Sequence, residues 1–422
     1  MPKLSSSHRP TTRQRLHPAT RNLLVARFLR SVGQGALLVG FALYLDRLGW
    51  TGGRIGLLLG IGGLGGGLLS LLVGVTTDRF GRRSFLLFYQ AVLVVVSLLL
   101  VITANPVAIF AATLVGGFGR GQAGAAGPFA PAEGAWLAEA VPPERRGAIF
   151  SMNAALGFFG MGAGALVAGA VPWVQRWLPT AAAYRTLFVL SAAGSLAVLM
   201  IVRATPGGAG HGRISALRDV DTEASRVRRA ENRSLLLLMV TNAFNGVAIG
   251  LTGPLIAYWF YLKFAMGPGK LGPVLAVTFV LTGLAALATG ALTRSFGIVR
   301  SVVVGRALGL GLLVLLPLTP TYHLAAAAYA LRSALSRGTV GARQALAVNL
   351  VGDARRGLAT SLNTVSMILP ATVGPVIAGM LLERGHLALP FFIAAVLQLI
   401  YLVLYTALFR RREVPPGPEL VE

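Results

Sequence analysis

Long apolar stretches separated by short polar segments run through the whole chain and limit what it can fold into. A membrane-spanning helix needs about 20 mostly apolar residues. Such segments lie near 22–45, 54–76, 84–103, 107–140, 147–172, 184–203, 234–262, 271–293, 299–318, 322–350, 357–382 and 387–409. Lipid offers no partners to backbone polar groups, so segments of this length must be helices. The pattern predicts an all-α polytopic membrane protein with twelve transmembrane helices.

The composition excludes a water-soluble enzyme. Of the 422 residues, 55% are hydrophobic and 12% are charged, whereas soluble domains average about 25% charged residues. The chain has no cysteine, so disulfides and thiolate metal sites are excluded, and we expect no metal or cofactor. Arg27 and Arg30 interrupt the first apolar run, and no A-x-A site follows it, so we expect this run to stay as a helix rather than be cleaved as a signal peptide.

The basic residues predict the orientation. Alternate connections carry 24 Lys and Arg residues on one side of the membrane and 7 on the other. Because Lys and Arg accumulate in cytoplasmic loops, both termini are predicted to be cytoplasmic. The net charge of +24 then belongs to the cytoplasmic face and does not indicate a nucleic-acid partner. We expect a multi-pass protein of a prokaryotic cytoplasmic membrane.

The two halves of the chain repeat one another. The sequence 145–147, Arg-Arg-Gly, recurs at 355–357, and Phe-Gly at 80–81 recurs at 296–297. We therefore predict two pseudo-symmetric six-helix bundles at 22–203 and 234–409, tails at 1–21 and 410–422, and a linker at 204–233. The linker pattern is that of an amphipathic surface helix, either a tether or a regulatory segment. Parallel six-helix repeats are typical of transporters that bind their substrate between the halves.

One motif carries a resemblance to a known family. The connection between the second and third segments reads G-V-T-T-D-R-F-G-R-R, and its defining residues are Gly74, Asp78, Arg79, Gly81, Arg82 and Arg83. It resembles the G-x-x-x-D-R-x-G-R-R motif of the major facilitator superfamily. The resemblance implies the major facilitator fold, alternating access, and a role for Asp78, Arg79 and Arg83 in stabilising the outward-facing state. We expect a four-residue loop here, in which Gly81 permits a tight turn.

Two further glycine patterns resemble motifs of proton-coupled and antiporting members of this family. Arg120 in the fourth segment precedes a glycine-rich stretch, although the spacing is shifted by one residue. The other pattern lies in the fifth and eleventh segments and includes Gly160, Gly164, Gly374, Pro375 and Gly379. Since small residues let helices approach closely, helix packing is the simpler interpretation of these glycines.

Few charged residues fall at membrane depth, and they are the candidates for coupling. Glu133 is the only acidic residue predicted inside a segment. Arg30, Arg120, Arg332 and Arg343 are expected near the cavity, whereas Arg27 and Arg306 are expected to reach the cytoplasmic surface. Arg343 is the repeat equivalent of Glu133. We therefore expect these two to pair when the cytoplasmic entrance closes, with local pairing of Glu133 as the alternative.

These features predict a monomeric secondary transporter rather than an enzyme. The first interpretation is proton-coupled efflux of a small amphipathic molecule, as in the drug–proton antiporters that the chain resembles. Aromatic residues such as Phe41, Tyr44, Trp136, Tyr258 and Trp259 either line a cavity for it or face lipid or the packed core. The alternative is an exporter or facilitator of organic anions or lipid-like phosphates, because the expected cavity holds several arginines and one acid. No H-E-x-x-H cluster or nucleotide-binding loop is present.

Overall fold

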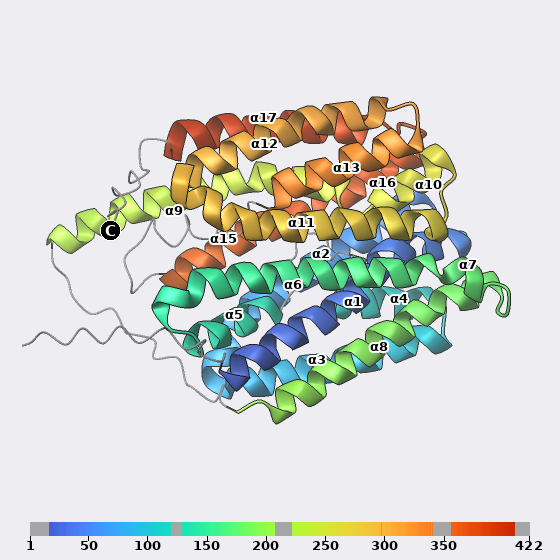
Figure 1. The fold of residues 1–422 in the computed structure, drawn as a ribbon, viewed down its shortest axis with the longest axis horizontal. Coiled ribbons are helices and arrows are strands. Elements are labelled where there is room, and N and C mark those ends of the chain that lie inside the picture. The colour runs from blue at the N-terminus through green and yellow to red at the C-terminus, as the bar shows by residue number, and fades with distance from the viewer. Residues whose placement is uncertain are drawn as a thin grey trace, which may run out of the picture.

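The computed structural model describes residues 17–119, 129–206, 222–296, 298–338, 340 and 356–409, and every regular element in these ranges is a helix. The helices form two groups that lie side by side, α1–α8 and α9–α17, with α6 and α11 along the boundary (Figure 1). The all-α polytopic fold is therefore confirmed. It satisfies the backbone hydrogen bonds within each helix, as a bilayer requires.

The first bundle holds the helices before the linker. These are α1 (Pro18–Arg47), α2 (Gly52–Phe80), α3 (Arg82–Ile102), α4 (Pro106–Gly116), α5 (Phe129–Glu139), α6 (Pro143–Gly169), α7 (Val171–Val174) and α8 (Thr180–Ala204). Most of α1 is buried, because it packs against both α6 and α8. It forms the centre of this bundle.

The second bundle repeats this arrangement. Its helices are α9 (Thr222–Thr252), α10 (Ile256–Phe264), α11 (Pro268–Phe296), α12 (Ile298–Leu315), the 3-10 helix η2 (Leu316–Leu318), α13 (Tyr322–Arg337), α15 (Arg356–Ala371), α16 (Val373–Glu383) and α17 (Leu389–Phe409). Helix α9 packs against α15 and α17, as α1 packs against α6 and α8. The two bundles thus share a helix order and a packing pattern.

Nine helices in the described ranges are long and apolar enough to cross a membrane. The predicted fourth and tenth segments pass through residues 120–128 and 341–355, which are not described, and the ninth is among the shorter apolar helices. The count of twelve therefore stays a prediction.

Several predicted segments are interrupted rather than continuous helices. In the segment at 107–140, α4 ends at Gly116 and Gly117 is left-handed, with φ of 65°. The segment at 234–262 divides into α9 and α10 around Pro254, and the one at 357–382 divides into α15 and α16 at Thr372. Proline lacks a backbone N–H and clashes with the preceding turn, so Pro254 in the first segment, and Pro370 and Pro375 in the second, interrupt the hydrogen bonds of the helix.

Neighbouring helices lie very close together at the glycines that the sequence analysis assigned to helix packing. A Cβ atom added to Gly164 of α6 would collide with the carbonyl oxygen of Val32 and lie 2.8 Å from the Ala36 nitrogen of α1. At Gly379 of α16 it would lie 3.0 Å from the Gly56 Cα of α2. Gly160 and Gly374 lie at equally tight contacts, with α1 and α9, and Pro375 faces Gly56. These glycines set how near the helices lie, both within and between bundles.

We expect Gly164→Ala to lower the free energy of unfolding by about 1–3 kcal/mol, the usual cost of overpacking. Gly147→Ala in the same helix is the control, because nothing lies within 4 Å of its added Cβ. Thermal unfolding of both variants in detergent micelles gives the comparison. Equal midpoints for the two variants would contradict the close approach of α1 and α6.

Candidate functional site

The residues of the family motif lie at the junction of α2 and α3. Gly74, Asp78 and Arg79 belong to the last turns of α2, and nothing is described of the Asp78 and Arg79 side chains. Helix α2 continues to Phe80 and α3 begins at Arg82, so the expected four-residue loop is wrong. Gly81 alone makes the connection, with φ of 80°, a conformation that glycine adopts without strain.

The two arginines after this turn contact other helices of the first bundle. Arg82 forms an ion pair with Glu139 at the end of α5. Arg83 donates a hydrogen bond to the carbonyl oxygen of Arg203 in α8. Both interactions therefore hold the ends of α3, α5 and α8 together. The predicted role of this motif in one transport state stays a prediction.

A buried ion pair lies deeper in the same bundle. Nη2 of Arg30 in α1 donates to Oε2 of Glu133 in α5 at 2.8 Å, and the two side chains are 3% and 2% exposed. Glu133 thus has a local partner, the alternative to the expected pairing with Arg343. Arg120 and Arg343 both lie outside the described residues.

A second arginine is buried beside this pair. Arg27 lies one turn before Arg30 on α1 and is 4% exposed. Its guanidinium group packs on α6, where an added Cβ at Gly157 would lie 2.6 Å from Nε. The expectation that Arg27 reaches the cytoplasmic surface is therefore wrong, because the absence of a side chain at Gly157 makes room for it inside the bundle. The charges of Arg27, Arg30 and Glu133 interact.

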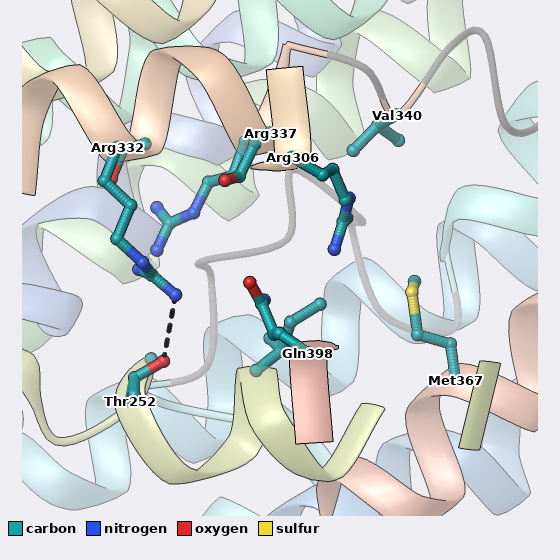
Figure 2. Close-up of a pocket in the computed structure, with 11 residues that line it drawn as sticks. Thr252, Arg306, Arg332, Arg337, Val340, Met367 and Gln398 are labelled. Atoms are coloured by element: carbon teal, nitrogen blue, oxygen red, sulfur yellow. Dashed lines mark hydrogen bonds between the residues drawn. The ribbon is translucent and has the colours of Figure 1, made fainter. Parts of the chain in front are cut away.

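The second bundle contains a cavity that is lined by three arginines (Figure 2). It is small, with a volume of about 40 Å³. Its lining residues come from α9, α12, α13, α15 and α17, together with Gly253 just after α9 and Val340 just after α13. They are Ile249, Thr252, Gly253, Arg306, Arg332, Ser333, Ser336, Arg337, Val340, Met367 and Gln398. We call it the arginine cavity.

The three guanidinium groups reach into the arginine cavity from two helices. Arg332 of α13 donates to the Thr252 hydroxyl at 3.5 Å, and Arg337 donates to the Tyr329 hydroxyl at 3.1 Å. Arg306 of α12 donates to Oδ1 of Asn245 at 2.5 Å. In Figure 2 the three side chains surround one space above Thr252 and Gln398.

Charge distinguishes the arginine cavity chemically. Among the described residues that line it none is acidic, and three positive charges lie together there. The buried Oε1 of Gln398 and the Oγ of Ser333 have no hydrogen-bond partner among the described residues. Guanidinium groups bind carboxylate, sulfonate and phosphate groups through paired hydrogen bonds. The arrangement is suited to an anion.

Sequence reasoning singled out some of these residues and missed others. Arg332 was expected near the transport cavity between the halves. It lines the arginine cavity within the second bundle, and its role in transport stays a prediction. Arg306 was expected at the surface but is 4% exposed, because Asn245 and the Tyr401 ring hold its guanidinium group inside the bundle. Arg337 and Gln398 were not proposed. Gln398 is a polar residue in an otherwise apolar helix, and that signal could have identified it.

The aromatic residues expected to line a drug cavity pack elsewhere. Phe41, Tyr44, Tyr258 and Trp259 belong to one hydrophobic core, and Trp136 belongs to another. Rings of this core contact one another, as Tyr44 contacts Phe188 with centroids 5.7 Å apart. In the described part of the chain none of the five lines the arginine cavity.

The bundles are closed against each other at the end where α1 meets α10, here called the far end (Figure 1). Helix α2 packs on α16, and α6 packs on α11. Glu383 at the end of α16 accepts a hydrogen bond from the Gly53 N–H at 2.7 Å. This N–H is in the first turn of α2, where the helix dipole favours an anionic side chain. Glu383 thus links one bundle to the other.

Comparison with known proteins supplies independent findings. The chain matches the family model described as Major Facilitator Superfamily over residues 23–236 and 238–421. An uncharacterized membrane protein of Saccharomyces cerevisiae is 22% identical over 397 residues, covering 87% of this chain and 88% of that protein. A D-xylose–proton symporter structure has a TM-score of 0.69 at 14% identity, covering 92% of this chain and 96% of its own. The human organic anion transporter MFSD10 has a TM-score of 0.62 at 16% identity, covering 92% and 100%.

We expect Glu383→Ala to open the far end more often. Removal of a hydrogen bond to an exposed carboxylate at a helix N-terminus costs about 0.5–1.5 kcal/mol, which corresponds to roughly a two- to tenfold shift. Because the chain has no cysteine, a single Val376→Cys substitution, next to Gly60, can report opening by its rate of maleimide labelling. Arg384→Gln is the matched control at the neighbouring position. An unchanged labelling rate in the Glu383→Ala protein would contradict the link.

Proposed function

The chain belongs to the major facilitator superfamily, and we propose that it is a secondary transporter of small organic anions that works by alternating access. Members of this superfamily are multi-pass membrane proteins that carry small molecules. Transport of an organic anion is the alternative function that the sequence analysis gave beside drug efflux. The arginine cavity is the observation that places it ahead of the interpretation as a drug exporter.

The lining of the arginine cavity supports an organic anion rather than an inorganic one. Arg306, Arg332 and Arg337 provide several donors in fixed planar groups, which match a carboxylate, sulfonate or phosphate group. Ile249 and Met367 line the same cavity, so an apolar part of the cargo has apolar side chains to contact. Small-molecule sites combine an apolar lining with a few polar groups but are several hundred Å³ in volume. The arginine cavity, at about 40 Å³, must therefore widen during the transport cycle to admit an organic anion.

A cationic drug would meet three arginines in this cavity. Its described lining residues include no acid, and like charges in a low-dielectric environment repel strongly. The five aromatic residues expected to hold such a drug are packed in the core. A human organic anion transporter shares the fold, which demonstrates that this fold accommodates anions.

Alternating access is supported by the contacts between the bundles. The far end is closed by α2 against α16 and by α6 against α11. With the predicted orientation, in which the linker and termini are cytoplasmic, this closure lies on the external side. Transport then requires these contacts to open, and the motif residues Asp78, Arg79 and Arg83 are proposed to favour that outward-facing state.

We expect purified protein in liposomes to take up benzenesulfonate and not phenyltrimethylammonium, a probe with the same ring and the opposite charge. Replacing Arg332 or Arg337 with Gln should reduce benzenesulfonate affinity about tenfold or more, since a charged hydrogen bond contributes about 1.5–3 kcal/mol. Radiolabelled uptake measures both effects.

Arg54→Gln is the control for these variants. Arg54 is an exposed residue of α2 that stacks on Trp50, 4.9 Å from the ring centroid, and does not line the cavity. Its uptake of benzenesulfonate should equal that of the unmodified protein. Preferential uptake of the cation, or equal loss in all three variants, would contradict the proposed function.

A further inference from the structure

We propose that the corner where α7 meets the start of α11 binds the headgroup of an acidic phospholipid, and that the bound lipid favours the closed far end. The residues concerned, here called the lipid corner, are Trp173, Arg176, Trp177 and Lys270. The first three belong to α7 and the turn after it, and Lys270 belongs to α11. The inference goes beyond the proposed function, because it involves neither the cargo nor the arginine cavity.

Helix α7 and the turn that follows it have two different faces. The turn continues the helical path, since the Trp177 N–H donates to the Val174 carbonyl at 3.0 Å. Val171 is buried, and Val174 packs against the hydrophobic core. Trp173, Arg176 and Trp177 are exposed. Residues spaced by three and four positions share one side of a helical turn, so these three side chains form a single outer face.

The two tryptophans of the lipid corner are far more exposed than the others. Trp173 is 61% exposed and Trp177 is 76% exposed, whereas the remaining three tryptophans of the chain are at most 6% exposed. An indole ring combines an apolar body with a polar N–H group, so tryptophans of membrane proteins accumulate at the level of the lipid headgroups. The bilayer surface is therefore the partner that suits both rings.

The lipid-facing surface of α11 leads to the same corner. Exposed apolar residues recur along this helix at a spacing of three to four positions: Val277, Val280, Leu281, Leu284 and Leu287. Lys270 is exposed as well. It lies two turns before Val277 on the same side of the helix, about 10 Å beyond it. Lys270 thus lies where the apolar stripe ends, which is the level expected for headgroups.

Charge determines which lipid the corner favours. Arg176 and Lys270 are both basic and exposed, and the segments that contain them, 170–179 and 265–270, have no acidic residue. Guanidinium and ammonium groups donate charged hydrogen bonds to phosphate. Each basic side chain near an anionic bilayer surface contributes about a fivefold preference. A phospholipid with a net negative headgroup is therefore favoured over a zwitterionic one.

The lipid corner is made by both bundles. Pro172 of α7 lies against α11, since a Cβ atom added to Gly269 would lie 3.1 Å from Cγ of Pro172. Arg176 follows Pro172 by one turn, and Lys270 is next to Gly269, so the two basic residues lie on either side of the boundary (Figure 1). Opening of the far end separates α6 and α7 from α11 and divides the corner. A lipid that contacts both parts binds the closed arrangement more tightly and shifts the population toward it.

The first experiment tests contact with lipid and the preference for charge. Protein in phosphatidylcholine nanodiscs receives a small fraction of phospholipid with a nitroxide near the glycerol end of one acyl chain. We expect labelled phosphatidylglycerol to quench tryptophan fluorescence more than labelled phosphatidylcholine does. Salt at about 1 M should remove the difference, because it screens charges beyond about 3 Å. The double variant Trp173→Phe and Trp177→Phe should lose most of the quenching, because the remaining tryptophans are buried.

The double variant Arg176→Gln and Lys270→Gln should keep the quenching but lose the preference for phosphatidylglycerol. Arg384→Gln is the control, because it removes an exposed basic residue at the end of α16, outside the corner. It should retain the preference. Equal quenching by the two lipids at low salt, or quenching by aqueous iodide and by neither lipid, would overturn the proposed site.

The second experiment tests the effect of the lipid on the far end. The Val376→Cys reporter should react with maleimide about fivefold more slowly in phosphatidylglycerol nanodiscs than in phosphatidylcholine nanodiscs, the contribution of one basic residue. Addition of Arg176→Gln and Lys270→Gln should make the two rates equal, whereas addition of Arg384→Gln should not. The same ratio of rates with and without Arg176 and Lys270 would overturn the effect on closure.

Inorganic phosphate distinguishes a lipid from a soluble anion. Added to the reporter protein in phosphatidylcholine nanodiscs, it should leave the labelling rate unchanged, because it lacks the acyl chains that hold a headgroup at the bilayer surface. Slower labelling with phosphate would overturn the lipid as the partner. Neither experiment measures transport, so its failure leaves the proposed anion transport intact, and absence of benzenesulfonate uptake would leave the lipid corner intact.

Discussion

Charge buried among apolar helices is the constraint on which the rest of this structure depends. Arg27, Arg30, Arg306 and Arg332 are each no more than 5% exposed, in helices that otherwise present apolar side chains to lipid or to one another. Each charge at this depth requires a partner or a ligand. The first bundle satisfies part of the requirement with Glu133, and the acceptors described in the second include Asn245 and Thr252. The two halves therefore share a fold, and the buried ion pair that the structure describes lies in the first.

The features that depend on local hydropathy could be predicted from the sequence. The helical class and the positions of most helices follow from runs of apolar residues, and Glu133 and Arg332 were recognised because charged residues are rare in such runs. The partner of Glu133 was not predictable in the same way. Repeat symmetry indicated Arg343, whereas the structure pairs Glu133 with Arg30, because the rotation of α1 about its axis brings Arg30 against α5. Hydropathy contains no information on that rotation.

The positions of Arg27 and Arg306 illustrate the same difficulty. Each lies toward the predicted cytoplasmic end of its segment, so a long side chain was expected to extend to water. Instead, Gly157 leaves space for the Arg27 guanidinium group, and the Tyr401 ring lies 5.0 Å from that of Arg306. Gly157 and Tyr401 both belong to helices that are distant in the sequence from the arginines they contact. The breaks in the helices near Pro254 and Thr372 follow from the prolines in these segments, but the direction that the chain takes after each break depends on the neighbouring helices.

Glu133 is the only buried carboxylate in the described part of the chain, and this has a consequence for the tolerance of the first bundle to substitution. Loss of one partner of a buried ion pair leaves an uncompensated buried charge, at a cost of about 3–5 kcal/mol. A neutral residue at position 133 therefore destabilises the first bundle, whatever part the carboxylate plays in transport.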